Sequence, residues 1–344
     1  MTPLDMSTDS PMRTDSPMHT DSPAAPPATP EPPATPQPAA TSPATPQPPA
    51  APPATPHRGR ARTAALQEPL LDLLGVSGGE PFVADLHAHT VTSDGADTLE
   101  EVLGKSRVRG VTHQAITNHD TTIGLTDAAD LAARTGAHIV CGTEVSAYDP
   151  ATGRHVHVLG LGLSEGSPAV EALCAPTLAR RTANTSWQLE RLLADGIEVD
   201  VDECARHAAR STAFYWQHLM AGLTSEPRGS ETFERIYRSL FAKGAPYSRD
   251  IAYVDMRDAV RAILDDGGLP VLAHPAQYDS FDAVSVLADA GLAGIEAYHY
   301  TSSPADERRI LDLAGEHSLF VTGGSDYHGT FSLPPHPGYR TICN

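Results

Sequence analysis

Cysteine is scarce in this sequence, and long apolar runs are absent. The four cysteines, Cys141, Cys174, Cys204 and Cys343, form no CxxC pair, which argues against a disulfide framework and predicts reduced thiols. No apolar run approaches the roughly 20 residues that a membrane-spanning helix needs. The beginning, MTPLDMSTDSP, has neither the basic nor the apolar region of a secretory signal. We therefore expect a cytoplasmic protein that does not engage a membrane.

Basic residues are also few. The chain has 24 lysines and arginines against 43 aspartates and glutamates, which gives a net charge of −19. A protein that binds long nucleic acids needs a broad face of the opposite sign. A phosphate-bearing substrate of this chain is therefore expected to be small, or to be held by metal ions that reverse the field locally. No motif identifies a protein partner.

Proline is plentiful only at the beginning, because 18 of the 31 prolines fall within residues 1–57. That stretch has almost no aliphatic side chain larger than alanine, so it cannot bury enough apolar surface to offset its ordering entropy. We expect residues 1–57 to be a disordered tail, residues 58–81 a linker and residues 82–344 one large domain. His19 and His57 lie in the expected tail and are assigned no chemical role.

From Phe82 onward, short apolar segments alternate with helical ones. FVADLHAH, THQAITNHD, AHIVCGTEVSA and RHVHVLGLGL, and later LPVLAHP, LAGIEAYHY and LFVTGGSDYHG, have the pattern of strands that end in polar residues. The alternation is typical of a parallel α/β barrel or sheet, whose loops converge at the carboxyl ends of the strands. Residues 168–262 interrupt it with helical spacing of Leu, Trp and Phe, which predicts a helical insertion over the barrel mouth. Its aromatic residues are either a substrate platform or, as helical spacing favours, core: Trp187, Phe214, Tyr215 and Trp216.

Histidines and carboxylates recur at the ends of these strands. His87 and His89 are two residues apart, so strand alternation turns both side chains to one face, where one ion can bind both. Buried charges without partners are costly, and a histidine and carboxylate set of this size suits two or three divalent cations, whether Mn, Fe or Zn. The nine candidate metal ligands are His87, His89, Asp94, His119, Glu144, His157, His274, Asp326 and His328.

These motifs resemble those of the PHP (polymerase and histidinol phosphatase) family of metal-dependent phosphoesterases. DLHAHTVTSDG, TNHD, AHP and GSDYHG occur in the family's order and spacing between about Phe82 and Phe331. GTEVSA, HVLGLGL, EAYH and the expected insertion are similar to the bacterial branch that dephosphorylates nucleoside 3',5'-bisphosphates and trims short oligonucleotides. The resemblance implies a distorted (β/α)7 barrel.

The resemblance also implies an arrangement of ions. One ion is expected on His87, His89, Glu144 and Asp326, a second on Asp94, His119 and His328, and a third on Glu144, His157 and His274. The expected reaction is hydrolysis of a phosphomonoester of a small substrate, nucleotide-like or from specialised metabolism, by a hydroxide shared between ions. The alternatives are a phosphodiesterase or short-oligonucleotide exonuclease, and a non-catalytic metal-bound scaffold.

Four further residues are candidates for catalysis or substrate binding. His299, at another strand end, is either a general acid or phosphate contact, or ordinary polar lining. Asp120 follows a candidate ligand and either orients it or caps the next helix. Arg210 and Lys243 stand near the positions where the resemblance places contacts to substrate phosphates. Three other arginines are expected to be solvated surface charges: Arg180, Arg181 and Arg249.

Overall fold

The computed structural model describes residues 61–77, 79–333 and 336–343, with side chains from residue 67 onward. The expected tail, residues 1–57, lies outside the described residues. None of the helices in the described part of the chain combines the length and hydropathy needed to cross a membrane.

Seven strands form a nearly closed barrel in the order β8-β7-β6-β4-β3-β2-β1. The strands are β1 (Val83–Asp85), β2 (His113–Ile116), β3 (His138–Tyr148), β4 (His155–Leu161), β6 (Leu269–Leu272), β7 (Gly294–Tyr298) and β8 (Phe320–Gly323). The two ends of this order approach each other, because the amide of Leu86 donates to the carbonyl of Gly323 at 3.0 Å. The expected distorted seven-stranded barrel is confirmed.

One strand departs from the expected parallel pattern. β4 runs antiparallel to both neighbours, β3 and β6, because only the short loop between Tyr148 and His155 connects it to β3. The amino end of β4 therefore lies beside the carboxyl ends of the parallel strands. Two short strands complete the sheet: β5 (Val254–Asp255) pairs with β3, and β9 (Ile342–Cys343) pairs antiparallel with β1.

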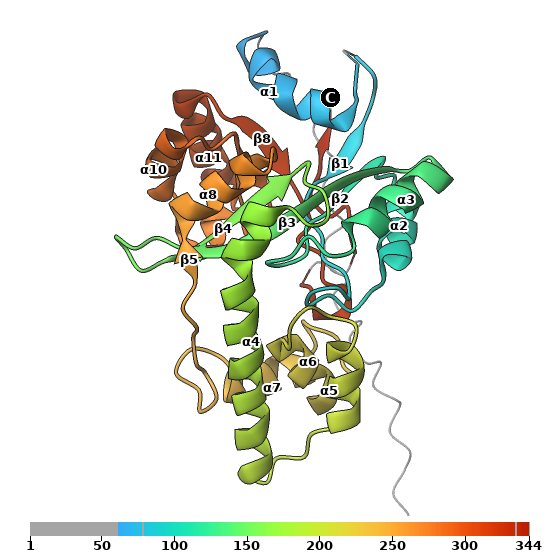
Figure 1. Ribbon diagram of the computed structural model, residues 1–344, viewed down its shortest axis with the longest axis vertical. Coiled ribbons are helices and arrows are strands. Elements are labelled where there is room, and N and C mark those ends of the chain that lie inside the picture. Colours follow the sequence, from blue (N-terminus) through green and yellow to red (C-terminus); the bar gives the residue numbers. More distant parts are fainter. Residues whose placement is uncertain (1–60, 78, 334–335, 344) are drawn as a thin grey trace, which may run out of the picture. The chain divides into compact units, whose positions relative to one another are not determined.

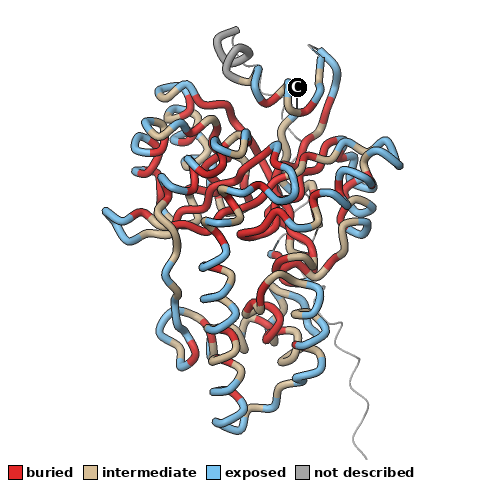
Figure 2. The backbone as a smooth tube through the Cα atoms, in the orientation of Figure 1, coloured by how far each residue is buried: buried red, intermediate tan, exposed pale blue. Residues whose placement is uncertain are grey.

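Helices pack on the outside of the barrel. They are α2 (Leu99–Val108), α3 (Leu125–Thr135), α8 (Met256–Asp265), α9 (Pro275–Tyr278), α10 (Ala283–Ala290) and α11 (Pro304–His317), followed by the short 3-10 helix η1 (Gly329–Phe331). Capping boxes at Thr98 and Ser303 satisfy the first amides of α2 and α11. Apolar residues of α8, α10 and α11 form one core with strand residues such as Val158 and Ile295. Figure 2 shows the buried residues concentrated in the strands and the helix faces against them.

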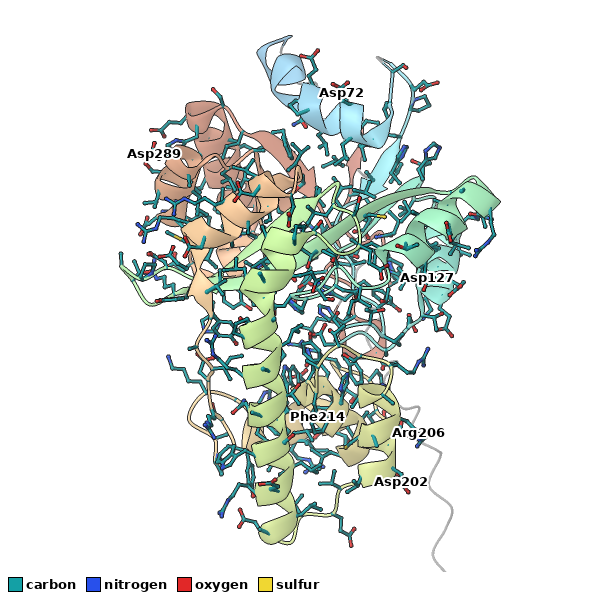
Figure 3. The ribbon with its side chains drawn as sticks, in the orientation of Figure 1. Asp72, Asp127, Asp202, Arg206, Phe214 and Asp289 are labelled. Carbon is teal, nitrogen blue, oxygen red and sulfur yellow. The ribbon has the colours of Figure 1, made fainter. Side chains whose placement is uncertain are left out.

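A helical insertion extends from the barrel, as expected. It contains α4 (Pro168–Ala194), α5 (Val201–Ala208), α6 (Trp216–Leu223) and α7 (Glu231–Leu240), and Figure 1 shows α4 running from the sheet to the other three. The insertion has its own core around Leu192, Leu219 and Phe233, against which Phe214 packs (Figure 3). The expected boundary at residue 262 is wrong, because α8 packs its Val260 and Ile263 into the barrel core.

The expected linker contains a helix that belongs to the barrel. α1 (Ala61–Leu74) buries Leu70 and Leu74 beside residues of six strands, including Leu161 and Phe320. It covers the end of the barrel where the parallel strands begin, opposite the end where they terminate. The linker prediction for residues 58–81 is therefore wrong over this helix, because two leucines one helical turn apart provide an apolar face that the neighbouring proline-rich composition obscured.

Candidate metal centre

The barrel brings all nine candidate ligands into one connected cluster. His87 and His89 follow β1, His119 follows β2, His274 follows β6, and Asp326 and His328 follow β8. Isolated bridges between His119 and Glu144 and between Ala88 and Tyr327 continue the sheet beyond its regular strands. Glu144 and His157 lie within β3 and β4 rather than at strand ends, and His157 reaches the cluster because β4 is antiparallel.

Glu144 is the centre of this cluster. Its Oε2 lies 3.1 Å from Nε2 of both His87 and His89 and 3.3 Å from Nδ1 of His119. Its Oε1 lies 2.7 Å from Nδ1 of His157 and 2.8 Å from Nε2 of His274. The carboxylate is 1% exposed, so five imidazoles surround one charge that water hardly reaches.

Three overlapping groups have ligand atoms within 4.8 Å of one another. Two share His89, and two share Glu144, so neighbouring ions would have common ligands. The second group includes His89 in addition to the three residues expected there. The third includes His119 in place of the expected His274, whose Nε2 still lies 2.8 Å from Oε1 of Glu144. The groups are His87, His89, Glu144 and Asp326; His89, Asp94, His119 and His328; and His119, Glu144 and His157.

Several of these buried polar atoms have no hydrogen-bond partner among the described residues. They include Nε2 of His87, both ring nitrogens of His89, Oε2 of Glu144 and Nδ1 of His274. Buried polar groups are normally paired, because an unmet donor or acceptor costs free energy. Converging ring nitrogens and carboxylate oxygens that lack hydrogen-bond partners are the ligands that a divalent cation requires, so the residues present fit metal ions.

The histidines of the cluster lower the pKa values of its carboxylates. Burial alone would raise the pKa of Glu144, but His87, His119 and His157 outweigh it and hold that pKa well below its usual range. Asp94 and Asp326 have lowered pKa values for the same reason. Three negative charges therefore persist within the site and offset the charge of bound cations.

The backbone around the site is held in uncommon conformations. Asp120, His274 and Asp326 have φ values of 58°, 25° and 50°, a region that residues other than glycine rarely adopt. Gly324 is required for a different reason, because a Cβ atom there would lie 2.2 Å from Cβ of His87. The GGSDYH segment thus passes close enough to β1 for Asp326 to reach the cluster.

Glu296, in the middle of β7, orients two of the candidate ligands. Its carboxylate lies 3.3 Å from Nδ1 of His87 and accepts the backbone amide of His274 at 2.9 Å. The first contact turns Nε2 of His87 toward Glu144, as carboxylates do for ligating histidines. His299 is fully buried beside it, with Nε2 at 3.4 Å from Oδ2 of Asp326 and Nδ1 at 2.7 Å from Oγ1 of Thr301. Burial lowers the pKa of His299.

Asp120 is not a helix cap, because α3 begins only at Leu125, after Gly124. Its Oδ1 accepts the amide of Ser146 at 2.8 Å, and its Oδ2 pairs with Nη2 of Arg181 at 2.9 Å. Arg181 also donates to Oγ of Ser146, which lies 3.5 Å from Nδ1 of His119. The expectation of a solvated Arg181 is wrong, since its side chain is 17% exposed and forms a buried ion pair.

The insertion contributes residues that motif analysis did not identify. The ring of Tyr215 stacks at 6.5 Å from that of His119 and meets His218 of α6 edge-on at 5.6 Å, so this aromatic borders the site. Gln217 donates to Oδ2 of Asp94 at 2.5 Å. Arg210 and Lys243 are both exposed; Arg210 directly precedes Ser211, which hydrogen-bonds to the carbonyl of Ser93 beside Asp94. For Lys243 the structure gives no contact with the cluster residues described above.

Comparison with known proteins assigns this fold and site to a family. The model of the PHP domain matches residues 85–194. A phosphoribosyl 1,2-cyclic phosphate 1,2-diphosphodiesterase of Eggerthella lenta is 54% identical over 75% of this chain and 99% of its own length. A 3',5'-nucleoside bisphosphate phosphatase of Chromobacterium violaceum is 32% identical over 71% of this chain and 86% of its own length. The chain belongs to the PHP family.

The solved structures agree with this assignment. An amidohydrolase from Chromobacterium violaceum, solved with bound sulfate and no metal, is 30% identical and superposes with a TM-score of 0.66 over 75% of this chain and 90% of its own. The protein described here is a metal-dependent phosphoesterase. A non-catalytic scaffold would be expected to have lost some of its ligands, whereas all nine candidate residues of this chain lie together in the cluster.

Proposed function

We propose that this enzyme hydrolyses a small cyclic phosphodiester, of the phosphoribosyl 1,2-cyclic phosphate type. The observation that supports the substrate is the relative named for that activity, which matches over 99% of its own length. The sequence alone had favoured a phosphomonoester. A diester is now the first candidate, and the phosphomonoester, supported by the more distant bisphosphate phosphatase, is the second.

The nine clustered residues are proposed to hold two or three divalent ions, with Glu144 shared between them. Such ions supply a coordinated water of lowered pKa and polarise the phosphoryl oxygens. The chain itself fixes the ligands: Glu296 orients His87, and Arg181 with Asp120 holds Ser146 beside His119. Asp120 is therefore proposed to act indirectly, through Ser146, as a positioning residue.

His299 is proposed as the side chain that meets the substrate at the reacting phosphate. It is 0% exposed, and its Nε2 has no hydrogen-bond partner in the described part of the chain. That atom is directed toward Asp326 at 3.4 Å, so it borders the proposed ion site. The hydroxyl of Thr301 lies 2.7 Å from Nδ1 of His299, and this hydrogen bond fixes the orientation of the ring.

Arg210 and Lys243 remain our proposals for contacts to a second phosphate of the substrate. A further candidate is Arg228, which contacts the segment that follows His328. Its Nη1 donates to the carbonyl of Phe331 at 3.4 Å, within η1, which directly follows His328. A guanidinium there suits a dianionic phosphate that does not react, because its planar fork can donate two hydrogen bonds.

Chromatographic separation of the products formed by metal-reconstituted enzyme tests the proposal, because opening a cyclic diester or cleaving a dinucleotide breaks one P–O bond without releasing inorganic phosphate. The panel contains phosphoribosyl 1,2-cyclic phosphate, a nucleoside 3',5'-bisphosphate and a dinucleotide, and we expect the highest kcat/KM on the cyclic diester. Activity on the bisphosphate alone would favour the second candidate, whereas products from the dinucleotide alone would favour an exonuclease.

The phosphate contacts are tested on the preferred substrate by Arg210→Ala, Lys243→Ala and Arg228→Ala. A residue that holds the distal phosphate should raise KM and leave kcat nearly unchanged. Omitting that phosphate from the substrate should abolish the difference from wild type, and a variant that still differs would place its residue elsewhere.

A further inference from the structure

Gln217 connects the helical insertion directly to the candidate metal centre. It lies on α6, is 7% exposed, and donates from Nε2 to Oδ2 of Asp94 at 2.5 Å. The two residues are 123 positions apart in the chain. Asp94 thus receives a fixed donor from an element outside the barrel.

The surrounding contacts show that this part of the insertion is docked on the loop that contains Asp94. The amide of Thr212 donates to the carbonyl of Thr92 at 2.9 Å, and Oγ of Ser211 donates to that of Ser93 at 2.5 Å. Tyr215 adds a hydrogen bond from its hydroxyl to the carbonyl of His119 at 3.4 Å. Gln217 therefore approaches Asp94 from a surface held in place at several points.

The bond from Gln217 fixes the orientation of the Asp94 carboxylate among the candidate ligands. Oδ2 accepts from the Gln217 amide and lies 3.8 Å from Nε2 of His119. Oδ1 accepts from Oγ of Ser93 at 3.2 Å and lies 3.3 Å from Nε2 of His328 and 3.8 Å from Nδ1 of His89. Outer hydrogen bonds of this kind orient metal-ligating carboxylates and change metal affinity when removed. Oε1 of the same amide is buried and has no partner among the residues the structure describes, so the side chain is not placed there by a second hydrogen bond.

We propose that Gln217 is a positioning residue of the metal centre, which holds the Asp94 carboxylate in the orientation that faces the candidate ligands His89, His119 and His328. The inference rests on the metal dependence in the proposed function. It makes the insertion part of the ion-binding machinery in addition to being a cover over the barrel mouth. The proposed role of Gln217 concerns the binding of a divalent cation, so the test measures metal affinity and not catalytic activity.

The experiment compares Gln217→Leu with Gln188→Leu in metal-free protein titrated with Mn²⁺ by calorimetry. Gln188 is a close control, because it is a buried glutamine of the same insertion that donates once, to the carbonyl of Tyr247 at 2.8 Å, and also has an unpartnered Oε1. We expect Gln217→Leu to weaken at least one class of Mn²⁺ site by about tenfold or more. Gln188→Leu should retain wild-type Mn²⁺ affinity even if its melting temperature falls.

Equal affinity in wild type and Gln217→Leu would overturn the inference, while wild type that binds no Mn²⁺ would instead overturn the proposed metal dependence. If Gln217→Leu does not fold, Gln217→Asn provides the same comparison with a shorter polar side chain that cannot reach Asp94. A cycle with Asp94→Asn adds a second criterion, because the two changes should be non-additive in affinity if Gln217 acts through Asp94. Additive losses would also contradict the proposal.

Discussion

Five imidazoles surround Glu144, so this one residue contacts more candidate ligands than any other carboxylate of the cluster described above. Its two oxygens face different histidines, so the carboxylate lies between two of the three ligand groups. A neutral amide of the same size would keep the packing but remove the charge that offsets two dications. The spacing of the proposed ions would therefore depend on the charge of Glu144.

We therefore expect Glu144→Gln to lose at least about a hundredfold in kcat, the scale of misplacing a reacting group by about an ångström. Elemental analysis of the purified variant should also show lower metal content than wild type. His113→Gln, a histidine remote from the cluster, is the control and should retain wild-type turnover. Wild-type kcat in both variants would rule out the role assigned to Glu144.

Arg181 provides a test of structure rather than turnover. Burial alone would lower the pKa of Arg181, but Asp120 outweighs that effect and raises it, so the guanidinium stays charged. Arg181→Met leaves Asp120 buried with an uncompensated charge, which should cost about 3–5 kcal/mol of unfolding free energy. Urea denaturation measures the loss. As a control, Arg180→Met at the adjacent exposed position should lower the free energy of unfolding by less than about 0.5 kcal/mol. Equal losses in the two variants would show that the Arg181–Asp120 ion pair does not stabilise the fold.

His113 predicts how stability varies with pH. Burial and the stacked ring of His138, at 4.4 Å, lower the pKa of His113 below its usual value of 6.5. The unfolded chain therefore binds a proton more readily than the folded one, so this residue destabilises the fold as pH falls below about 6.5 and has no effect above it. We expect the melting temperature of His113→Gln to fall less than that of wild type between pH 7.5 and 5.5. Equal falls in melting temperature for the two proteins would show that His113 does not titrate as described.

At the scale of the element, the structure predicts that α1 contributes to stability, whereas the sequence alone predicts a linker there. Leu70 is fully buried inside the barrel's own core, so Leu70→Ala should reduce the free energy of unfolding by about 2–5 kcal/mol. The exposed Asp72 on the same helix (Figure 3) is the control, and Asp72→Ala should change stability little. Denaturant melts compare the two, and similar small effects would return residues 58–81 to the status of a linker.

The elements also show why some features were predictable and others were not. The histidines and carboxylates of the cluster could be predicted because each lies in a short motif. Successive strands of the barrel bring these motifs to the same end. Gln217 and Arg181 were missed because helical sequence around them contains no motif, and their partners, Asp94 and Asp120, are 123 and 61 residues away. The antiparallel direction of β4 depends on one short loop, which strand patterning does not reveal.

At the scale of the whole molecule, the number of ligands exceeds what one ion can use. The protein should hold at least two equivalents of divalent transition metal after reconstitution, as elemental analysis would show. Chelation should lower the melting temperature, since ions bind the folded state in preference to the unfolded one. Less than one equivalent, with an unchanged melting temperature, would be incompatible with the cluster as a metal centre.

The contact between the two ends of the barrel has a consequence for how the protein matures. Ser325 bonds to Asp85 across 240 residues of sequence, and the amide of Asp326 donates to the carbonyl of His87. At roughly 5–20 residues per second, synthesis of that interval takes on the order of 10 to 50 s. During this time the histidines following β1 are already made, while Asp326 and His328 are not. A nascent chain therefore passes through a long period with an incomplete ligand set, and correct metal loading must follow translation rather than accompany it.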